Sequence, residues 1–252
     1  MLSFRNIECY SELIDENEFF KQFYNPDLPL RYDSNFFQLK YQPTLSEFEL
    51  IEEMQYQFHA NEGLKHMKFY WPENKGFTSE IMAYFEKEHY AIEMLELYTI
   101  DPNNFKSDKQ TNHIEIYPLS KENLADYKRI NYPNDLIFGK EFADMKKNMY
   151  EQMLDNPSII PYIAYVDSEP AGSLISVIGE ETVEIDDLLT VTHLRKQGVA
   201  TALQEAVMTL AQKNLKQVIL VADGDDTQKD MYLKQNYTCI GFRLGAQKVF
   251  AK

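Results

Sequence analysis

Residues 186–201 read Asp186-Asp187-Leu188-Leu189-Thr190-Val191-Thr192-His193-Leu194-Arg195-Lys196-Gln197-Gly198-Val199-Ala200-Thr201, an apolar strand pattern that passes through a short turn into an amphipathic helix. After the turn, apolar residues recur at helical spacing, namely Val199, Leu203, Ala206, Val207, Leu210 and Ala211. This periodicity predicts a helix that begins near Gly198 and buries one face. Its first turn therefore faces the loop.

The predicted helix start is suited to an anion. The first N–H groups of a helix have no partner within the helix and carry the positive end of its dipole. Residues 194–203 contain no Asp or Glu, while Arg195 and Lys196 add positive charge. Gly198 and Ala200 keep side-chain bulk away from a ligand. The stretch predicts a cradle for a diphosphate, although this pattern alone is also typical of a plain turn beside a solvated basic pair.

The surrounding chain favours the cradle. The turn lies between a strand and a helix, and a second apolar strand, residues 217–222, follows the helix at once. The chain contains neither the dinucleotide fingerprint Gly-x-Gly-x-x-Gly nor the P-loop pattern. The two commonest phosphate loops are therefore excluded.

The stretch resembles the acetyl-CoA loop of the GNAT superfamily of N-acetyltransferases, whose pattern is Gln/Arg-x-x-Gly-x-Gly/Ala. Arg195, Gly198 and Ala200 fill its positions, although the proline that the family commonly has before the loop is missing. The resemblance implies that the helix start holds the pyrophosphate of coenzyme A, and that the preceding strand bulges so that its backbone binds the pantetheine arm. The cofactor-binding residues that it implies are Leu189, Thr190, Val191, Arg195, Lys196, Gln197, Gly198, Val199, Ala200, Thr201 and Asp225.

Acetyl transfer to an amine requires that the amine lose a proton and that the departing thiolate be stabilised or protonated. Three carboxylates, Glu184, Asp186 and Asp187, precede the expected bulge, and we predict Glu184 as the base. The alternative is that these acids are solvated strand edges. Residues 225–237 resemble the family pattern Asn-x-x-Ala-x-x-Leu-Tyr-x-Lys-x-Gly-Phe, which implies that Tyr232 points its hydroxyl at the coenzyme A sulfur. Without that motif, such a Tyr is typically a packing residue.

Composition limits the possible functions. The 252 residues carry a net charge of −15, which argues against binding to nucleic acid or to an anionic membrane. No apolar run is long enough to span a membrane, and the N-terminus has no signal-peptide core, so we predict a cytoplasmic protein. The two cysteines lie far apart without metal-ligand spacing, and no metal site is expected.

The order of predicted elements suggests an internal repeat. Strand, helix, strand, helix and strand are predicted at 30–40, 45–60, 67–71, 79–88 and 90–100, and again at 183–191, 198–213, 217–222, 226–236 and 238–250. A further helix is predicted at 10–24. The second half adds a strand at 114–118, a helix that Ser120 caps, a helix at 141–155, and a hairpin of strands 161–166 and 171–178.

We therefore predict an α/β (α+β) protein of two GNAT-like domains, each a mixed, mostly antiparallel central sheet flanked by helices. The polar stretch 101–112 predicts the boundary, with a degenerate N-terminal domain at 1–110 and a catalytic domain at 111–252. The first copy has two carboxylates in the first turn of its helix, which repel a diphosphate. Two unrelated α/β domains are the alternative.

The sequence thus predicts an acetyl-CoA-dependent N-acetyltransferase that uses no metal and acetylates a primary amine of a small molecule or peptide by direct attack in a ternary complex. Two other functions fit the residues. A non-catalytic acyl-CoA-binding sensor needs the loop but neither Glu184 nor Tyr232. An interaction module that uses the acidic, aromatic first half needs none of them.

Overall fold

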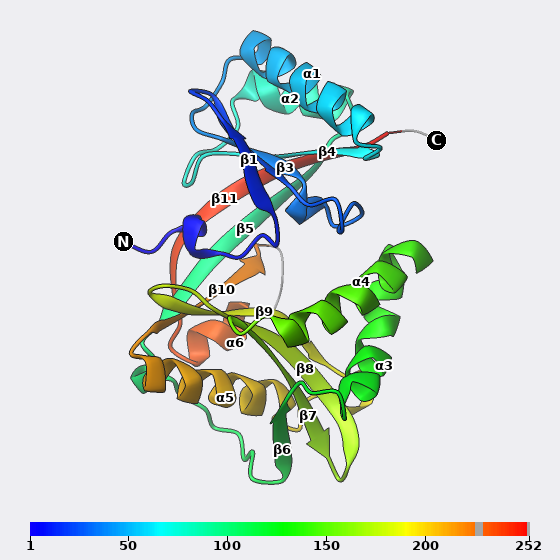
Figure 1. Cartoon of the computed structure of the whole chain (residues 1–252). Coiled ribbons are helices and arrows are strands. Elements are labelled where there is room, and N and C mark those ends of the chain that lie inside the picture. The colour runs from blue at the N-terminus through cyan, green and yellow to red at the C-terminus, as the bar shows by residue number, and fades with distance from the viewer. Residues whose placement is uncertain (225–228, 251–252) are drawn as a thin grey trace. The chain divides into compact units, whose positions relative to one another are not determined.

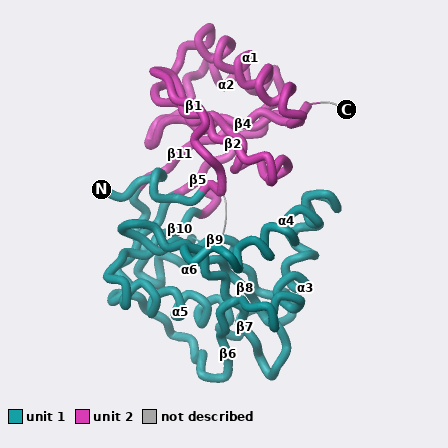
Figure 2. The backbone as a smooth tube through the Cα atoms, viewed as in Figure 1, with its two compact units in different colours: residues 1–8, 97–221, 227–240 teal, residues 9–96, 222–226, 241–252 magenta. Residues whose placement is uncertain are grey.

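The computed structural model describes residues 1–224 and 229–250, which fold into two compact units (Figure 2). Of the described residues, unit 1 contains 1–8, 97–221 and 229–240, and unit 2 contains 9–96, 222–224 and 241–250. Neither unit is continuous in the sequence. The boundary predicted between residues 110 and 111 would separate two domains that are each continuous in the sequence. It stays a prediction.

Unit 1 is built on a mixed sheet in which the strand order is β5-β10-β9-β8-β7-β6 (Figure 1). Its strands are β5 (Ala91–Ile100, which enters the unit at Leu97), β6 (Ile114–Pro118), β7 (Ile159–Val166), β8 (Glu169–Ile178), β9 (Thr182–Thr190) and β10 (Gln217–Asp223, which leaves the unit after Val221). Strands β6 to β9 pair antiparallel, whereas β9 and β10 pair parallel. Helix α5 (Val199–Asn214) connects β9 to β10, because a parallel pair needs a crossover. The predicted fold class is confirmed.

Helices cover both faces of this sheet. Neighbouring residues of a strand point to opposite faces. On β8, a Cβ atom added to Gly172 would meet the side chains of Val199 and Leu203 on α5, whereas the Ser173 hydroxyl donates to Asn131 on α3 (Leu124–Asp135). Helix α5 therefore packs on one face and α3 on the other, where α4 (Lys140–Gln152) lies beside α3 (Figure 1).

Unit 2 has a sheet in the order β1-β2-β3-β4-β11 with two helices against it (Figure 1). The elements are β1 (Glu12–Glu16), β2 (Phe20–Tyr24), β3 (Phe36–Leu39), α1 (Leu45–Asn61), β4 (His66–Tyr70), α2 (Ser79–Lys87) and β11 (Thr238–Val249, whose residues from Gly241 belong to this unit). Phe37 and Phe69 project from the sheet onto Phe48 of α1 and Phe85 of α2 in one aromatic core.

The two repeats are both present, and each unit takes its last strand from the other repeat. The element order β3-α1-β4-α2-β5 recurs as β9-α5-β10-α6-β11, where α6 is Lys229–Lys234. Within unit 2, β11 pairs with β4, and within unit 1 the Thr99 hydroxyl of β5 donates to the Val218 carbonyl of β10. This exchange explains why neither unit is continuous.

Two local predictions are wrong, and the end of one predicted helix differs. Residues 10–24 form the β1–β2 hairpin rather than a helix, because the Asn17 side chain accepts from the N–H groups of Phe19 and Phe20 and closes a turn. Ser120 does not cap α3, since its N–H donates to Asn123 and the helix begins at Leu124. The helix predicted at 141–155 ends at Gln152, where a 3₁₀ turn takes over.

Short 3₁₀ helices complete the chain at Phe4–Asn6, Tyr32–Ser34, Pro102–Asn104, Leu136–Phe138, Met153–Asp155 and Thr192–Leu194. None of the helices in the described residues combines the length and the apolar character that crossing a bilayer requires.

Candidate active site

The start of α5 presents backbone donors that have no partner among the described residues. Gly198 precedes the helix at φ 95° and provides no side-chain cap, and the first turn contains no acidic residue. The first helical hydrogen bond runs from the Ala202 N–H to the Gly198 carbonyl at 2.9 Å. The N–H groups of residues 199–201 therefore have no partner within the helix and point out of its positive end.

Strand β9 bulges just before this loop, as the resemblance implies. Its register with β8 shifts between the pairs Ile175–Asp186 and Ser173–Leu189, and Asp187 adopts φ 48°. The parallel ladder with β10 ends at Ile185, although β9 continues to Thr190. The end of β9 therefore leaves the β10 side of the sheet and lines a pocket.

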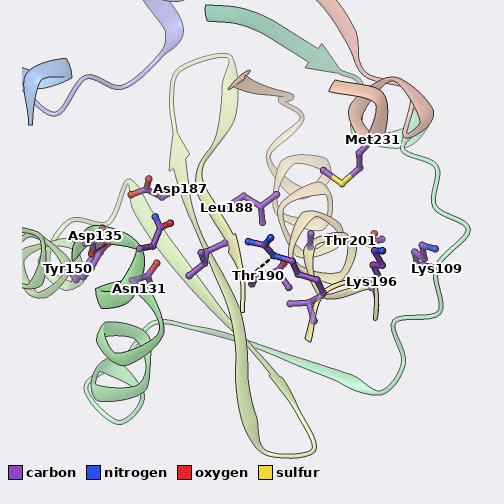
Figure 3. A pocket seen from close by; sticks show the side chains of 16 residues that line it. Lys109, Asn131, Asp135, Tyr150, Asp187, Leu188, Thr190, Lys196, Thr201 and Met231 are labelled. Carbon is purple, nitrogen blue, oxygen red and sulfur yellow. Dashed lines mark hydrogen bonds between the residues drawn. The ribbon is translucent and has the colours of Figure 1, made fainter. Parts of the chain in front are cut away.

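This pocket has a volume of about 550 Å³ and lies entirely within unit 1 (Figure 3). The predicted cofactor residues among its lining are Leu189, Thr190, Arg195, Lys196, Gly198, Val199, Ala200 and Thr201. Val191 and Gln197 are not among the lining residues, and Asp225 lies outside the described residues. The structure thus brings most of the predicted loop to one cavity.

One end of the pocket is cationic. Arg195 donates from Nε to the Thr190 carbonyl at 3.4 Å, so its guanidinium stays beside the end of β9. Lys196 and Lys109 also line this end, on the side of α5 (Figure 3). Lys109 belongs to the segment that leads into β6, and the Thr111 hydroxyl anchors that segment to Glu205 of α5 at 2.8 Å.

The other end carries carboxylates. Asp135 lines it at the end of α3, and its Oδ2 accepts from the Tyr150 hydroxyl of α4 at 2.9 Å. Asp187 lines it from the bulge and pairs with Lys146 of α4, whose Nζ lies 2.5 Å from Asp187 Oδ2. Burial raises the pKa of Asp135 to about 6, an effect that Asp187 adds to and that Lys146 and the Tyr150 hydrogen bond oppose.

Neither of the two residues predicted as catalytic is among the lining residues of the pocket. Glu184 is 4% exposed on β9, and its Oε2 accepts from the Glu8 N–H at 2.7 Å. Tyr232 of α6 is 6% exposed and packs its ring against Tyr98 and Tyr237, while its neighbour Met231 does line the pocket. Their catalytic roles stay predictions.

Sequence reasoning did not single out several lining residues, namely Lys109, Asn131, Asn134, Asp135, Tyr150 and Met231. All except Met231 lie far along the chain from the loop, and no spacing pattern links them to it. Among the described residues, no cluster of three or more His, Cys, Asp or Glu side chains is suited to a metal ion.

Two family models match the chain. Residues 123–247 match the acetyltransferase (GNAT) domain, and residues 2–98 match a family described as a domain of unknown function (DUF5613). No curated protein matches the chain. Lys109 lies in the segment that neither family model covers.

Solved structures share the fold. A functionally unknown conserved protein from Staphylococcus epidermidis is similar over 99% of this chain and 98% of its own, with 29% identity and a TM-score of 0.92. A GCN5-related N-acetyltransferase from Kribbella flavida covers 94% and 89%, with 12% identity and a TM-score of 0.63. A tandem GNAT protein from the clavulanic acid biosynthesis pathway covers 92% and 79%, with 6% identity and a TM-score of 0.59. The last two likenesses concern the fold alone.

Proposed function

Because residues 123–247 belong to the GNAT acetyltransferase family, we propose that the protein moves an acetyl group from acetyl-CoA to a primary amine of a small molecule or peptide. The observation that carries this proposal is the pocket at the α5 start, which has unpartnered N–H groups and cations at one end and carboxylates at the other. The first end suits a diphosphate, and the second suits an ammonium group.

We propose that the cationic end holds coenzyme A. The N–H groups of residues 199–201, together with Arg195 and Lys196, offer donors and positive charge to two linked phosphates. The end of β9, which no longer pairs with β10, offers backbone groups to an extended pantetheine arm. That arm then leads from the loop toward Asp187 along the strand.

Both substrates then occupy one pocket, which supports direct attack of the amine on the thioester. Holding the two reactants together replaces a bimolecular encounter by an oriented one. The roles that the sequence assigns remain proposals: Tyr232 donates a proton to the departing thiolate, and Glu184 accepts the amine's proton through water. Glu184 is the carboxylate that the sequence favours, while Asp135 and Asp187 are the carboxylates that line the pocket.

Two measurements test this function. The thermal shift with acetyl-CoA asks whether the protein binds the cofactor, and release of coenzyme A with a panel of polyamines, aminoglycosides, amino acids and peptide N-termini asks whether it transfers the acetyl group. We expect stabilisation by acetyl-CoA and amine-dependent release. Stabilisation without release for any amine favours an acyl-CoA sensor. No stabilisation favours an interaction module and contradicts the proposal.

A further inference from the structure

Asp135 is a buried carboxylate that has one hydrogen bond and no ion pair in the described part of the chain. It ends α3, is 6% exposed, and lines the acidic end of the pocket. Its hydrogen bond is the one that the Tyr150 hydroxyl donates. A buried carboxylate is costly unless a cation or several donors compensate its charge. The position therefore favours a positively charged ligand.

The cation nearest to this carboxylate, Lys146, already has an ion-pair partner. Lys146 is 4% exposed and pairs with Asp187, while its ammonium also lies 5.1 Å from the centre of the Tyr150 ring. The Lys146 charge therefore goes mainly to Asp187, whereas Asp135 keeps its charge toward the cavity. Asp135 therefore has no ion-pair partner among the described residues, although the Lys146 charge lowers its pKa.

The surroundings of Asp135 also make it a base. Burial raises its pKa to about 6, so the carboxyl group is ionised at neutral pH and still accepts a proton readily. The titratable groups that face it are Lys146 and Tyr150 from α4, Asp187 from β9 and Tyr127 from α3. Burial raises the pKa of both tyrosines well above the ordinary value, so they stay protonated.

We propose that Asp135 binds the ammonium group of the acceptor and takes its proton, an assignment that rests on the proposed function and adds the acceptor site to it. The ammonium gives one proton to the Asp135 carboxylate and becomes a neutral amine. The amine lone pair then forms the C–N bond, and the C–S bond breaks with its electron pair on sulfur. Tyr232 gives its proton to the thiolate and regains one from the second proton that nitrogen loses, and Asp135 releases its proton to solvent.

A test that needs no turnover follows the carboxyl carbon of Asp135 by ¹³C NMR across a pH titration. The Asp135→Asn variant identifies the signal, and it keeps an oxygen that accepts from Tyr150. Benzylamine is the cationic probe, and benzyl alcohol is its neutral counterpart. We expect benzylammonium to lower the pKa of Asp135 and benzyl alcohol to leave it unchanged. Equal effects of the two probes, or no effect of either, overturn the assignment.

Kinetics with an accepted amine separate a catalytic group from a merely structural one. Asp135→Asn should lower kcat/KM by about 100-fold near neutral pH, in the range typical of a lost general base. Part of this loss should return as the pH approaches the pKa of the amine, because the acceptor then deprotonates in solution. A loss that is the same at every pH contradicts the assignment. Asp144→Asn, at an exposed position of α4, is the matched control.

Two comparisons distinguish a failure of the Asp135 assignment from a failure of the proposed function. Acetyl-CoA affinity should stay unchanged in Asp135→Asn, so a wild-type protein that does not bind acetyl-CoA refutes the proposed function without involving Asp135. Glu184→Gln should keep the wild-type pH profile if Asp135 is the base. A profile that changes in Glu184→Gln and not in Asp135→Asn returns the role to Glu184 and overturns the assignment.

Discussion

The carbonyl oxygen of Gln110 lies directly beside Gly198, so close that a Cβ atom on Gly198 would approach it to 3.2 Å. Gly198 also holds φ 95°, a conformation that L side chains rarely adopt. The segment before β6 and the start of α5 therefore meet at a position that only glycine fits without strain. Both edges of the proposed phosphate site meet there.

Gly198→Glu should abolish acetyl-CoA binding, because it brings a carboxylate to the anion cradle and also strains the backbone by about 1–2 kcal/mol. Calorimetric titration measures the affinity, and the melting temperature reports folding. The control is Gly139→Glu, which has a similar φ of 106° but no atom within 4 Å of its added Cβ. A folded Gly198→Glu protein of wild-type affinity argues against this site.

Lys109→Glu should weaken coenzyme A binding by about tenfold, which is the effect of losing a hydrogen bond to a charged group. The difference should shrink at high salt, since an exposed charge is screened. Lys106→Glu makes the same charge change in the same segment at an exposed position outside the pocket lining. Equal weakening in both variants indicates general electrostatics instead of a contact by Lys109.

Tyr232→Phe should slow turnover by about tenfold or more and leave acetyl-CoA affinity close to that of the wild type, because a proton donor acts on the leaving thiolate rather than on the bound substrate. Tyr98→Phe is the control, since its ring lies 5.8 Å from that of Tyr232. Coenzyme A release under saturating acetyl-CoA measures the rate. Unchanged turnover removes Tyr232 from the mechanism.

Unit 2 should lose stability as the pH falls below 6.5. Burial lowers the pKa of His59 to about 4 and that of His66 to about 3, so both are neutral when folded and take up protons on unfolding. Each contributes a slope of up to about 1.4 kcal/mol per pH unit to the free energy of unfolding. Denaturant titrations at pH values between about 5 and 7 measure this slope.

The variant His59→Gln should flatten this dependence, whereas His113→Gln, at an exposed position, should not. Asp135 acts in the opposite sense, because its raised pKa makes the folded state bind more protons than the unfolded state between its ordinary value and about 6. The comparison with the wild type removes that contribution. Equal slopes in all three proteins argue against the buried histidines as the cause.

The spacing of apolar residues made the elements of unit 1 predictable. The helix from Val199, the hairpin of β7 and β8, and the parallel step to β10 all follow from apolar spacing and turn residues. The hairpin at residues 10–24 was not predictable in this way, because β1 is exposed on both faces and carries no alternation. The α1 face likewise buries Gln55 and His59, which bond to the backbone of β4.

Part of the candidate site was likewise predictable from the sequence, and part was not. The loop was predictable because Arg195, Gly198 and Ala200 form a local pattern at a strand-to-helix junction. The acidic end was not, because Asp135 and Tyr150 meet Asp187 only through the packing of α3 and α4 on the sheet. Lys109 lies in a polar stretch that predicts a linker, and the bond from Thr111 to Glu205 helps to place it beside α5.

A crystal structure of the protein with coenzyme A bound tests the central claim most directly. The account predicts the diphosphate within hydrogen-bonding distance of the N–H groups of residues 199–201, with Arg195 and Lys109 beside it. A diphosphate bound elsewhere, or a helix start covered by one of the protein's own carboxylates, contradicts the account.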